Sequence, residues 1–232
     1  MNNKFQLTLT FVLLSLIFSC KPKISSQSNN LTIEEKQTWD TLKIDTSMLQ
    51  RIRAYNSNII EPFHYALSKM YQDGKETELD PIYLNGFVFS EQSSKSYDLI
   101  FTLKDDFLNK GYTIFLLENN FNIGEKLDNI GVLNTVDKYE VLKLVGTNGA
   151  NYDISNDSVI TIIKQFDKKY ALELIGASGD WCEFVINAKT TDWNEFANEV
   201  YKVCPDVVDQ GTDTVEALAD EMKSPLTFSP KC

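Results

Sequence analysis

Hydrophobic positions along the chain follow two different periods, and each period predicts its own kind of element. Between residues 96 and 110 the apolar side chains recur at helical spacing, so a helix is predicted there. Two continuous apolar runs follow, at residues 112–117 and 128–133, and each is typical of a buried strand. The same reasoning predicts further helices at residues 46–55, 59–71, 137–145, 155–170, 193–204 and 213–224, and further strands at residues 82–89, 171–176 and 181–187.

Several of these helices begin at a polar residue that can cap a helix. Asp137, Asp192 and Asp213 each have a Glu three positions later, which is the spacing of a capping box. Ser155 stands at the start of another helix and can cap it in the same way. The connection at residues 177–180 is short, so the strands on either side of it are expected to form a hairpin.

The order of these elements predicts an α+β fold with a mixed or antiparallel sheet and helices packed mainly on one face. A weak internal repeat is also possible, because residues 96–145 and residues 155–204 share the order helix, strand, strand, helix. The ordinary alternation of helices and strands would explain the same similarity without a duplication. Both explanations stay open at the level of the sequence.

The N-terminal segment has the pattern of a bacterial lipoprotein signal. Lys4 supplies a positive charge, and residues 5–18 form an apolar run that is too short for a comfortable transmembrane helix. Ser19 followed by Cys20 resembles a lipobox, which implies cleavage before Cys20 and lipid on that residue. An ordinary signal peptide with a coincidental cysteine is the alternative.

This pattern divides the chain and predicts its location. Two or more acyl chains anchor a protein stably, so a lipidated Cys20 would suffice as the membrane attachment. We expect a membrane-anchored lipoprotein of the bacterial cell envelope that faces the periplasm or the exterior. The predicted parts are a signal peptide at residues 1–19, the lipidated Cys with a flexible tether at residues 20–45, and a single α+β domain at residues 46–232.

The net charge limits the possible binding partners, and the number of cysteines limits the possible disulfides. The formal net charge of −11 at pH 7 argues against a nucleic-acid partner. Three cysteines follow Cys20, namely Cys182, Cys204 and Cys232, so at most one bridge can form among them. A bridge between Cys182 and Cys204 is geometrically conceivable, because it would join a strand to a helix that packs on it.

The sequence contains few residues or motifs that could catalyse a reaction. His64 is the only histidine, which excludes a multi-histidine metal site, and its aromatic neighbours favour a structural or surface role. Nucleophile-elbow, P-loop and dinucleotide-binding motifs do not occur. Cys204 is predicted at a helix C-terminus beside Asp206, where the dipole and the carboxylate both disfavour a thiolate. We therefore predict no catalytic residue and no cofactor.

Carboxylates and amides nonetheless gather in three predicted loops. Oxygen-rich loops can bind a hard cation, but none here has the spacing of a dedicated calcium loop, so a metal stays an open question. We hypothesise that the first and third loops form one polar surface site; the alternative is that their side chains only build turns and cap helices. The candidate residues are Asn148, Asn151 and Asp153, then Asp180 and Glu183, then Asp206, Asp209 and Gln210.

Three blocks of the C-terminal half resemble a known family. They are TNGANYDI at residues 147–154, residues 175–177 with Asp180 and Trp181, and CPDVVDQGT at residues 204–212. They are similar to an uncharacterised bacterial domain family that is known only as a domain of unknown function. The resemblance covers residues 111–222 and implies domain boundaries, but no activity.

Two classes of function therefore stay open. The first is a lipid-anchored, non-catalytic binding protein, such as an immunity or stress-related factor, whose protein or small-molecule partner the sequence does not identify. The second is a metal-assisted hydrolase that uses the Asp, Asn and Gln residues of the loops. The acidic charge, the tether and the small catalytic inventory favour the first class.

Overall fold

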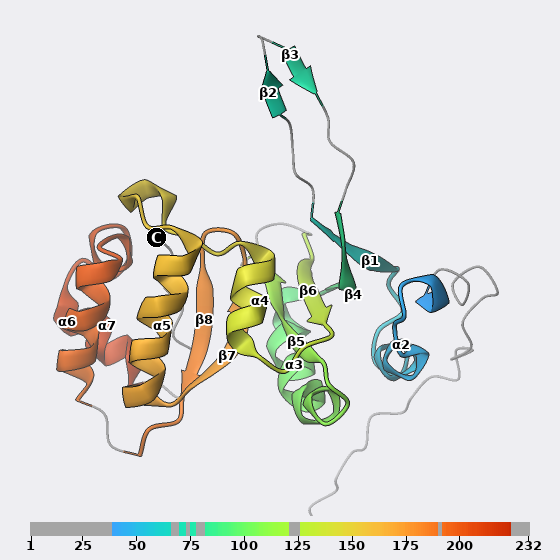
Figure 1. Cartoon of the computed structure of the whole chain (residues 1–232). Coiled ribbons are helices and arrows are strands. Elements are labelled where there is room, and N and C mark those ends of the chain that lie inside the picture. The colour runs from blue at the N-terminus through green and yellow to red at the C-terminus, as the bar shows by residue number, and fades with distance from the viewer. Residues whose placement is uncertain are drawn as a thin grey trace, which may run out of the picture.

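The computed structural model describes residues 39–65, 70–72, 75–77, 82–120, 126–189 and 192–223 (Figure 1). Its centre is one six-stranded sheet with the strand order β1-β4-β6-β5-β7-β8. All neighbouring strands are antiparallel except β5 and β7, which are parallel, so the sheet is mixed and the predicted α+β class is confirmed. Its strands are β1 (Ile60–Tyr65), β4 (Ile82–Glu91), β5 (Thr113–Glu118), β6 (Asp128–Leu133), β7 (Leu172–Ala177) and β8 (Cys182–Ile186). A separate two-stranded sheet pairs β2 (Met70–Gln72) with β3 (Lys75–Thr77).

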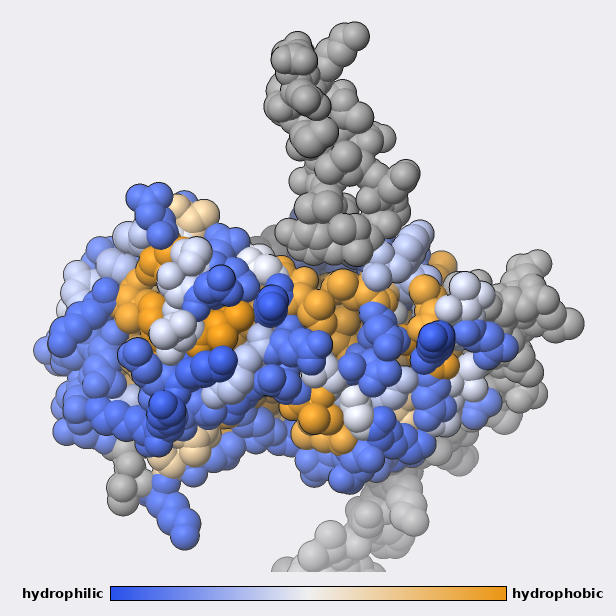
Figure 2. All heavy atoms as spheres, viewed as in Figure 1, coloured by the Kyte–Doolittle hydropathy of each residue, from blue (hydrophilic) through white to orange (hydrophobic). Residues whose placement is uncertain are grey.

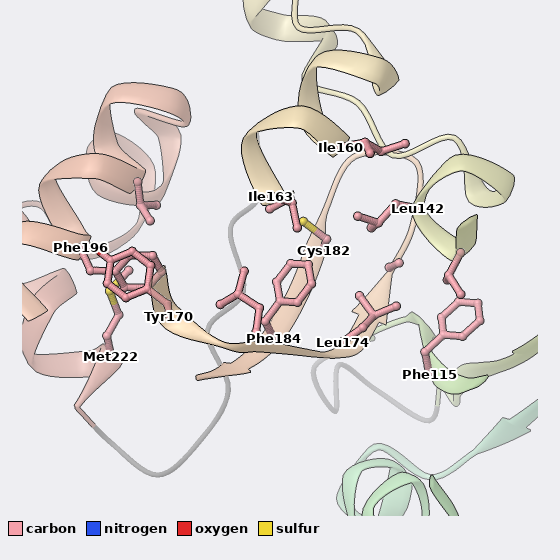
Figure 3. Packing of buried hydrophobic residues seen from close by; sticks show 14 of the residues in the cluster. Phe115, Leu142, Ile160, Ile163, Tyr170, Leu174, Cys182, Phe184, Phe196 and Met222 are labelled. Carbon is pink, nitrogen blue, oxygen red and sulfur yellow. The ribbon is translucent and has the colours of Figure 1, made fainter. Parts of the chain in front are cut away.

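Helices lie on both faces of the sheet, with more of them on one face. Alternate strand residues point to opposite faces, so Ile114 and Leu116 of β5 belong to one core and Phe115 belongs to the other. The first core contains α2 (Thr46–Arg53) and α3 (Ser93–Leu108). The second contains α4 (Lys138–Val145), α5 (Asn156–Tyr170), α6 (Trp193–Val203) and α7 (Val215–Met222), whose side chains converge on the β7–β8 hairpin (Figure 3).

The capping residues mostly act as the sequence predicts. Asp137, Ser155 and Asp192 are N-caps, and each side chain accepts a hydrogen bond from a backbone N–H of the first turn. The last helix differs, because Thr214 caps α7 and not Asp213. Asp213 instead ends the preceding π-helical turn, Val208–Thr212, with a left-handed φ of 64°. That backbone conformation keeps Asp213 outside α7.

The predicted helix at residues 59–71 is wrong. Its first part is the edge strand β1, in which Ile60 pairs with Phe89 and Glu61 with Val88 of β4. Proline is tolerated in an edge strand, and Pro62 occupies such a position. Pairing with a distant strand therefore overrides a local apolar spacing that happens to fit a helix.

The packed domain also begins before residue 46. Trp39 and Ile44, which the sequence assigns to the tether, are buried in the same core as α2 and α3. The Trp39 ring packs edge-on against Phe87, with 6.2 Å between the ring centroids. The predicted signal peptide and Cys20 lie outside the described residues.

The suggested internal repeat holds for the order of elements and only partly for their arrangement. The orders α3-β5-β6-α4 and α5-β7-β8-α6 match, and β5 and β7 are parallel neighbours whose next strands lie on their outer sides. However, α3 and α5 lie on opposite faces, whereas α4 and α6 lie on the same face. A single symmetry operation cannot relate both pairs of helices.

The cysteines do not pair as the sequence allowed. Cys182 is a buried free thiol, and Cys204 is disulfide-bonded, so the Cys182–Cys204 bridge does not form. Burial also raises the pKa of the Cys182 thiol to about 12, which keeps it protonated and unreactive. Across the described ranges, no helix combines the length and the apolar character needed to cross a membrane.

Candidate ligand-binding cleft

The parallel pair β5 and β7 creates a cleft where both strands end. Glu118 is the last residue of β5 and Asn119 follows it, while Ala177 ends β7 and the turn at residues 178–180 follows. Because parallel strands present their carboxyl ends at the same edge, the segments that leave them lie side by side and can enclose a ligand.

This cleft has a volume of about 590 Å³, which is within the range of small-molecule sites. The loop after α4 is tied to the β7–β8 turn, because Asn148 N–H donates to the Gly179 carbonyl at 2.8 Å and the Thr147 hydroxyl donates to the Ser178 carbonyl at 2.7 Å. Those bonds hold two walls of the cleft together. Its lining consists of Phe63, His64, Leu117, Glu118, Asn119, Val145, Gly146, Asn148, Ser178, Gly179, Asp180 and Trp181.

The charged side chains among the described lining residues of the cleft are acidic. Asp180 is exposed and forms no hydrogen bond or ion pair with the rest of the described chain. Glu118 accepts a hydrogen bond from the Asn129 amide at 2.8 Å and keeps its other oxygen for solvent or a ligand. Among the described residues that line the cleft there is no lysine or arginine. The cleft therefore favours a ligand with positive charge or with hydrogen-bond donors.

His64 is a cleft residue that the sequence did not reveal. Its ring is exposed, with Nδ1 3.4 Å from the Pro62 carbonyl and the ring centroid 6.4 Å from that of Tyr83. The sequence placed His64 in a helix, whereas the structure places it in β1, where it lines the same cleft as the β7–β8 turn. Only the pairing of β1 with β4 brings it there, so no local signal could have found it.

Of the candidate residues from the sequence, Asn148 and Asp180 line the cleft. The amide of Asn148 is engaged locally: its Nδ2 donates to the Gly146 carbonyl at 2.9 Å, and its Oδ1 accepts from Ala150 N–H at 3.0 Å. Asn148 thus shapes the wall, and Asp180 is the side chain that is free to bind.

The two polar loops of the hypothesis do meet, at a separate place. The Tyr152 hydroxyl donates to Asp206, which also accepts from the Gln210 amide at 2.7 Å. The Tyr201 hydroxyl donates to Asp209 at 3.2 Å. The hydrogen bond to Asp206 raises the pKa of Tyr152 to about 12. We call these five residues the tyrosine–carboxylate cluster, and its acids already have donors from the protein itself.

The remaining candidates lie elsewhere. Asn151 and Asp153 are exposed in the short 3-10 turn Ala150–Tyr152 and at its end, where Asp153 has a left-handed φ of 54°. Glu183 is buried in β8 beneath α3, and both of its oxygens lie within 3.1 Å of the Tyr97 hydroxyl. Burial raises the pKa of Glu183 to about 7. Glu183 therefore does not join the surface loops.

Metal ligation has little support within the described residues. No group of three or more His, Cys, Asp or Glu side chains there could hold a metal ion. The described residues therefore provide no set of ligands for a metal at the oxygen-rich loops.

Comparison with known proteins finds a family match for one stretch of the chain. Residues 129–228 match the model of a family described as a domain of unknown function (DUF4253). No curated protein and no solved structure matches the chain. The matched stretch contains Asn148 and Asp180, whereas His64 and Glu118 precede it, so the cleft is built from residues inside and outside that stretch. The family description names no activity.

Proposed function

We propose that this protein is a non-catalytic binding protein, attached to a membrane through a lipidated Cys20, whose ligand occupies the cleft. The observation that supports this proposal is the exposed Asp180 carboxylate, which has no partner in the described chain and faces a cleft whose described lining contains no lysine or arginine. A partner that carries positive charge satisfies that carboxylate.

Binding suits the chemistry of the cleft better than catalysis does. The contacts of His64 are the Pro62 carbonyl and the Tyr83 ring, so it is not oriented as a base toward a nucleophile. Ser178 uses its backbone to hold the loop after α4. A metal-assisted hydrolase remains the alternative, and metal analysis of the purified protein tests it directly.

Residence in the cell envelope agrees with the cysteine chemistry. Disulfides persist in oxidising compartments outside the cytoplasm, and Cys204 is disulfide-bonded. Replacing Cys20 with Ala should move the protein from the membrane fraction to the soluble fraction. If Cys20→Ala stays in membranes, the attachment lies elsewhere and this part of the proposal fails.

Capture from a lysate of its own cells tests the proposed site. The full chain, solubilised in detergent, is used as wild type, as Asp180→Lys and as Asp105→Lys, an equal charge change on the exposed side of α3. We expect Asp180→Lys to lose a captured component that wild type and Asp105→Lys both retain. Equal capture by all three proteins would contradict binding at the cleft.

A further inference from the structure

Half of one sheet face carries none of the described helices. The helices α4 to α7 pack over β5, β7 and β8, and in Figure 1 no described helix lies in front of β6, β4 and β1. Phe63 covers part of this face. A Cβ on Gly131 would lie 3.0 Å from the Phe63 ring and 2.8 Å from the Phe115 ring, so the absence of a side chain at Gly131 makes room for both rings.

A second hollow of about 530 Å³ lies on this uncovered half. Its lining includes Val88, Ser90 and Asn129 of the sheet, with Ile59 and Leu127 beside them. These last two side chains are 75% and 38% exposed, and Figure 2 shows hydrophobic surface over this part of the sheet. Exposed apolar surface that lines a hollow is typical of a binding site.

The second hollow adjoins the cleft. Phe63, His64 and Leu117 line both of them, and they form the boundary that the two spaces share. We call the combined space the sheet groove. It runs from Asp180 at the carboxyl ends of β5 and β7 to Ile59 beside the edge strand β1.

Charge in the sheet groove has one sign along its whole length. Glu61 lines the second hollow and Glu118 and Asp180 line the cleft, while no lysine or arginine is among the described residues that line either space. The Glu61 side chain is exposed and, like that of Asp180, has no hydrogen bond or ion pair with the described part of the chain. The unpaired acids therefore stand at opposite ends of an apolar floor.

We infer, on the basis of the proposed function, that the sheet groove binds an extended peptide segment of a partner protein, with basic residues separated by apolar ones. Basic side chains would pair with Glu61 at one end and Asp180 at the other. Apolar side chains would cover Leu117 and Val88, which are half-buried. An extended chain supplies this alternation, because its successive side chains point to opposite sides. A free polyamine would satisfy the acids but leave the floor exposed.

Fluorescence anisotropy with labelled synthetic peptides tests this inference on the full-length protein in non-ionic detergent, with empty micelles as the blank. The probes are a peptide of alternating Lys and Leu, a Lys and Ser peptide with the same charge, and a Glu and Leu peptide. We expect the Lys and Leu peptide to bind, the Lys and Ser peptide to bind about tenfold more weakly, and the Glu and Leu peptide not to bind.

Variants at both ends of the groove locate the bound peptide. Glu61→Lys and Asp180→Lys should each weaken binding of the Lys and Leu peptide by about tenfold, while Asp105→Lys should leave it unchanged. Thermal melting confirms that each variant folds, and Glu61→Gln and Asp180→Asn provide milder versions of the same test. An effect of Asp180→Lys without any effect of Glu61→Lys would show that the ligand occupies only the cleft, and would overturn the inference.

The remaining outcomes separate this inference from the proposed function. If spermidine competes as well as the Lys and Leu peptide, and the Lys and Ser peptide binds equally well, the site recognises charge alone; the peptide inference then fails and the proposed function stands. Absence of peptide binding overturns the inference as well. In that case the proposed function survives if lysate capture still depends on Asp180, and it fails if capture does not.

Discussion

The two halves of the sheet differ in how their faces are covered. The half formed by β5, β7 and β8 has α3 on one face and α4 to α7 on the other, so its side chains are buried on both sides. The half formed by β1, β4 and β6 is buried against α2 and α3 on one face, and its other face forms the floor of the sheet groove. The more heavily covered core therefore lies in one half of the sheet, while the sheet groove extends from the end of that half across the other.

The same contrast applies to the polar residues. The tyrosine–carboxylate cluster has a high density of acids and amides, but its carboxylates accept hydrogen bonds from Tyr152, Gln210 and Tyr201. Asp180 has few carboxylates or amides near it in the sequence, and its side chain has no hydrogen-bond or ion-pair partner in the described chain. A polar group without an internal partner is a better indication of a binding site than a dense polar loop, because it keeps its hydrogen-bonding capacity for a ligand.

The largest effect is expected in the covered half, at Phe196. Its ring is fully buried, with its centroid 4.1 Å from that of Tyr170 and 5.7 Å from that of Phe166. Phe196→Ala should lower the free energy of unfolding by about 3 to 5 kcal/mol, measured by urea denaturation. Phe101→Ala, at a half-exposed position on α3, should cost less than about 1 kcal/mol. A small loss at Phe196 would mean that α6 contributes little to the core.

The next effect concerns pH and the carboxylate buried under α3. Burial raises the pKa of Glu183 from an ordinary 4.5 to about 7. Because the folded-state pKa is above the unfolded one, this group has no effect on stability below about pH 4.5, and the cost of ionising it grows until about pH 7. The free energy of unfolding should fall by about 3 kcal/mol over that window, and Glu183→Gln should remove the decline.

A second variant sharpens the assignment of this pH dependence. The hydrogen bond from Tyr97 lowers the folded-state pKa of Glu183, so Tyr97→Phe should extend the upper end of the window of declining stability to higher pH and enlarge the decline. Denaturation curves collected across the pH range measure both variants. A decline that persists unchanged in Glu183→Gln would assign the pH dependence to other groups.

A smaller effect is expected in the uncovered half, at Gly131. A methyl group there would press on the rings of Phe63 and Phe115, so Gly131→Ala should cost about 1 to 3 kcal/mol and disturb the floor of the groove. Gly179→Ala is the matched control, because a Cβ at Gly179 meets no atom within 4 Å. Thermal denaturation compares the two. Equal stability of both variants would show that Phe63 does not depend on Gly131 for its place.

The smallest effect is expected in the tyrosine–carboxylate cluster. Asp206→Asn should lower the pKa of Tyr152 from about 12 toward its ordinary value of 10, because the hydrogen bond from the phenol to a carboxylate is lost. Absorbance titration of the tyrosines measures the change, and Tyr152→Phe identifies the signal. Peptide binding in the sheet groove should stay unchanged, whereas its loss would join the cluster to the binding site.

Local patterns in the sequence determine most of the individual elements. The strand at residues 128–133 has the predicted bounds, and the hairpin of β7 and β8 forms around its short connection. Asp137, Ser155 and Asp192 cap their helices because an N-cap needs only a side-chain oxygen near the backbone N–H groups of its own first turn. The order of helices and strands therefore follows from interactions between residues close in sequence.

Only the tertiary structure decides where these elements meet. The pairing of β1 with β4 turns an apparent helix into a strand and brings His64 into the cleft. The parallel contact of β5 with β7 places Glu118 near Asp180 although 62 positions separate them in the sequence. The structure also decides that Cys182 remains a free thiol, because the sequence left a bridge to Cys204 open. Contacts between distant segments leave no periodic trace in the chain, because each depends on how the whole sheet assembles.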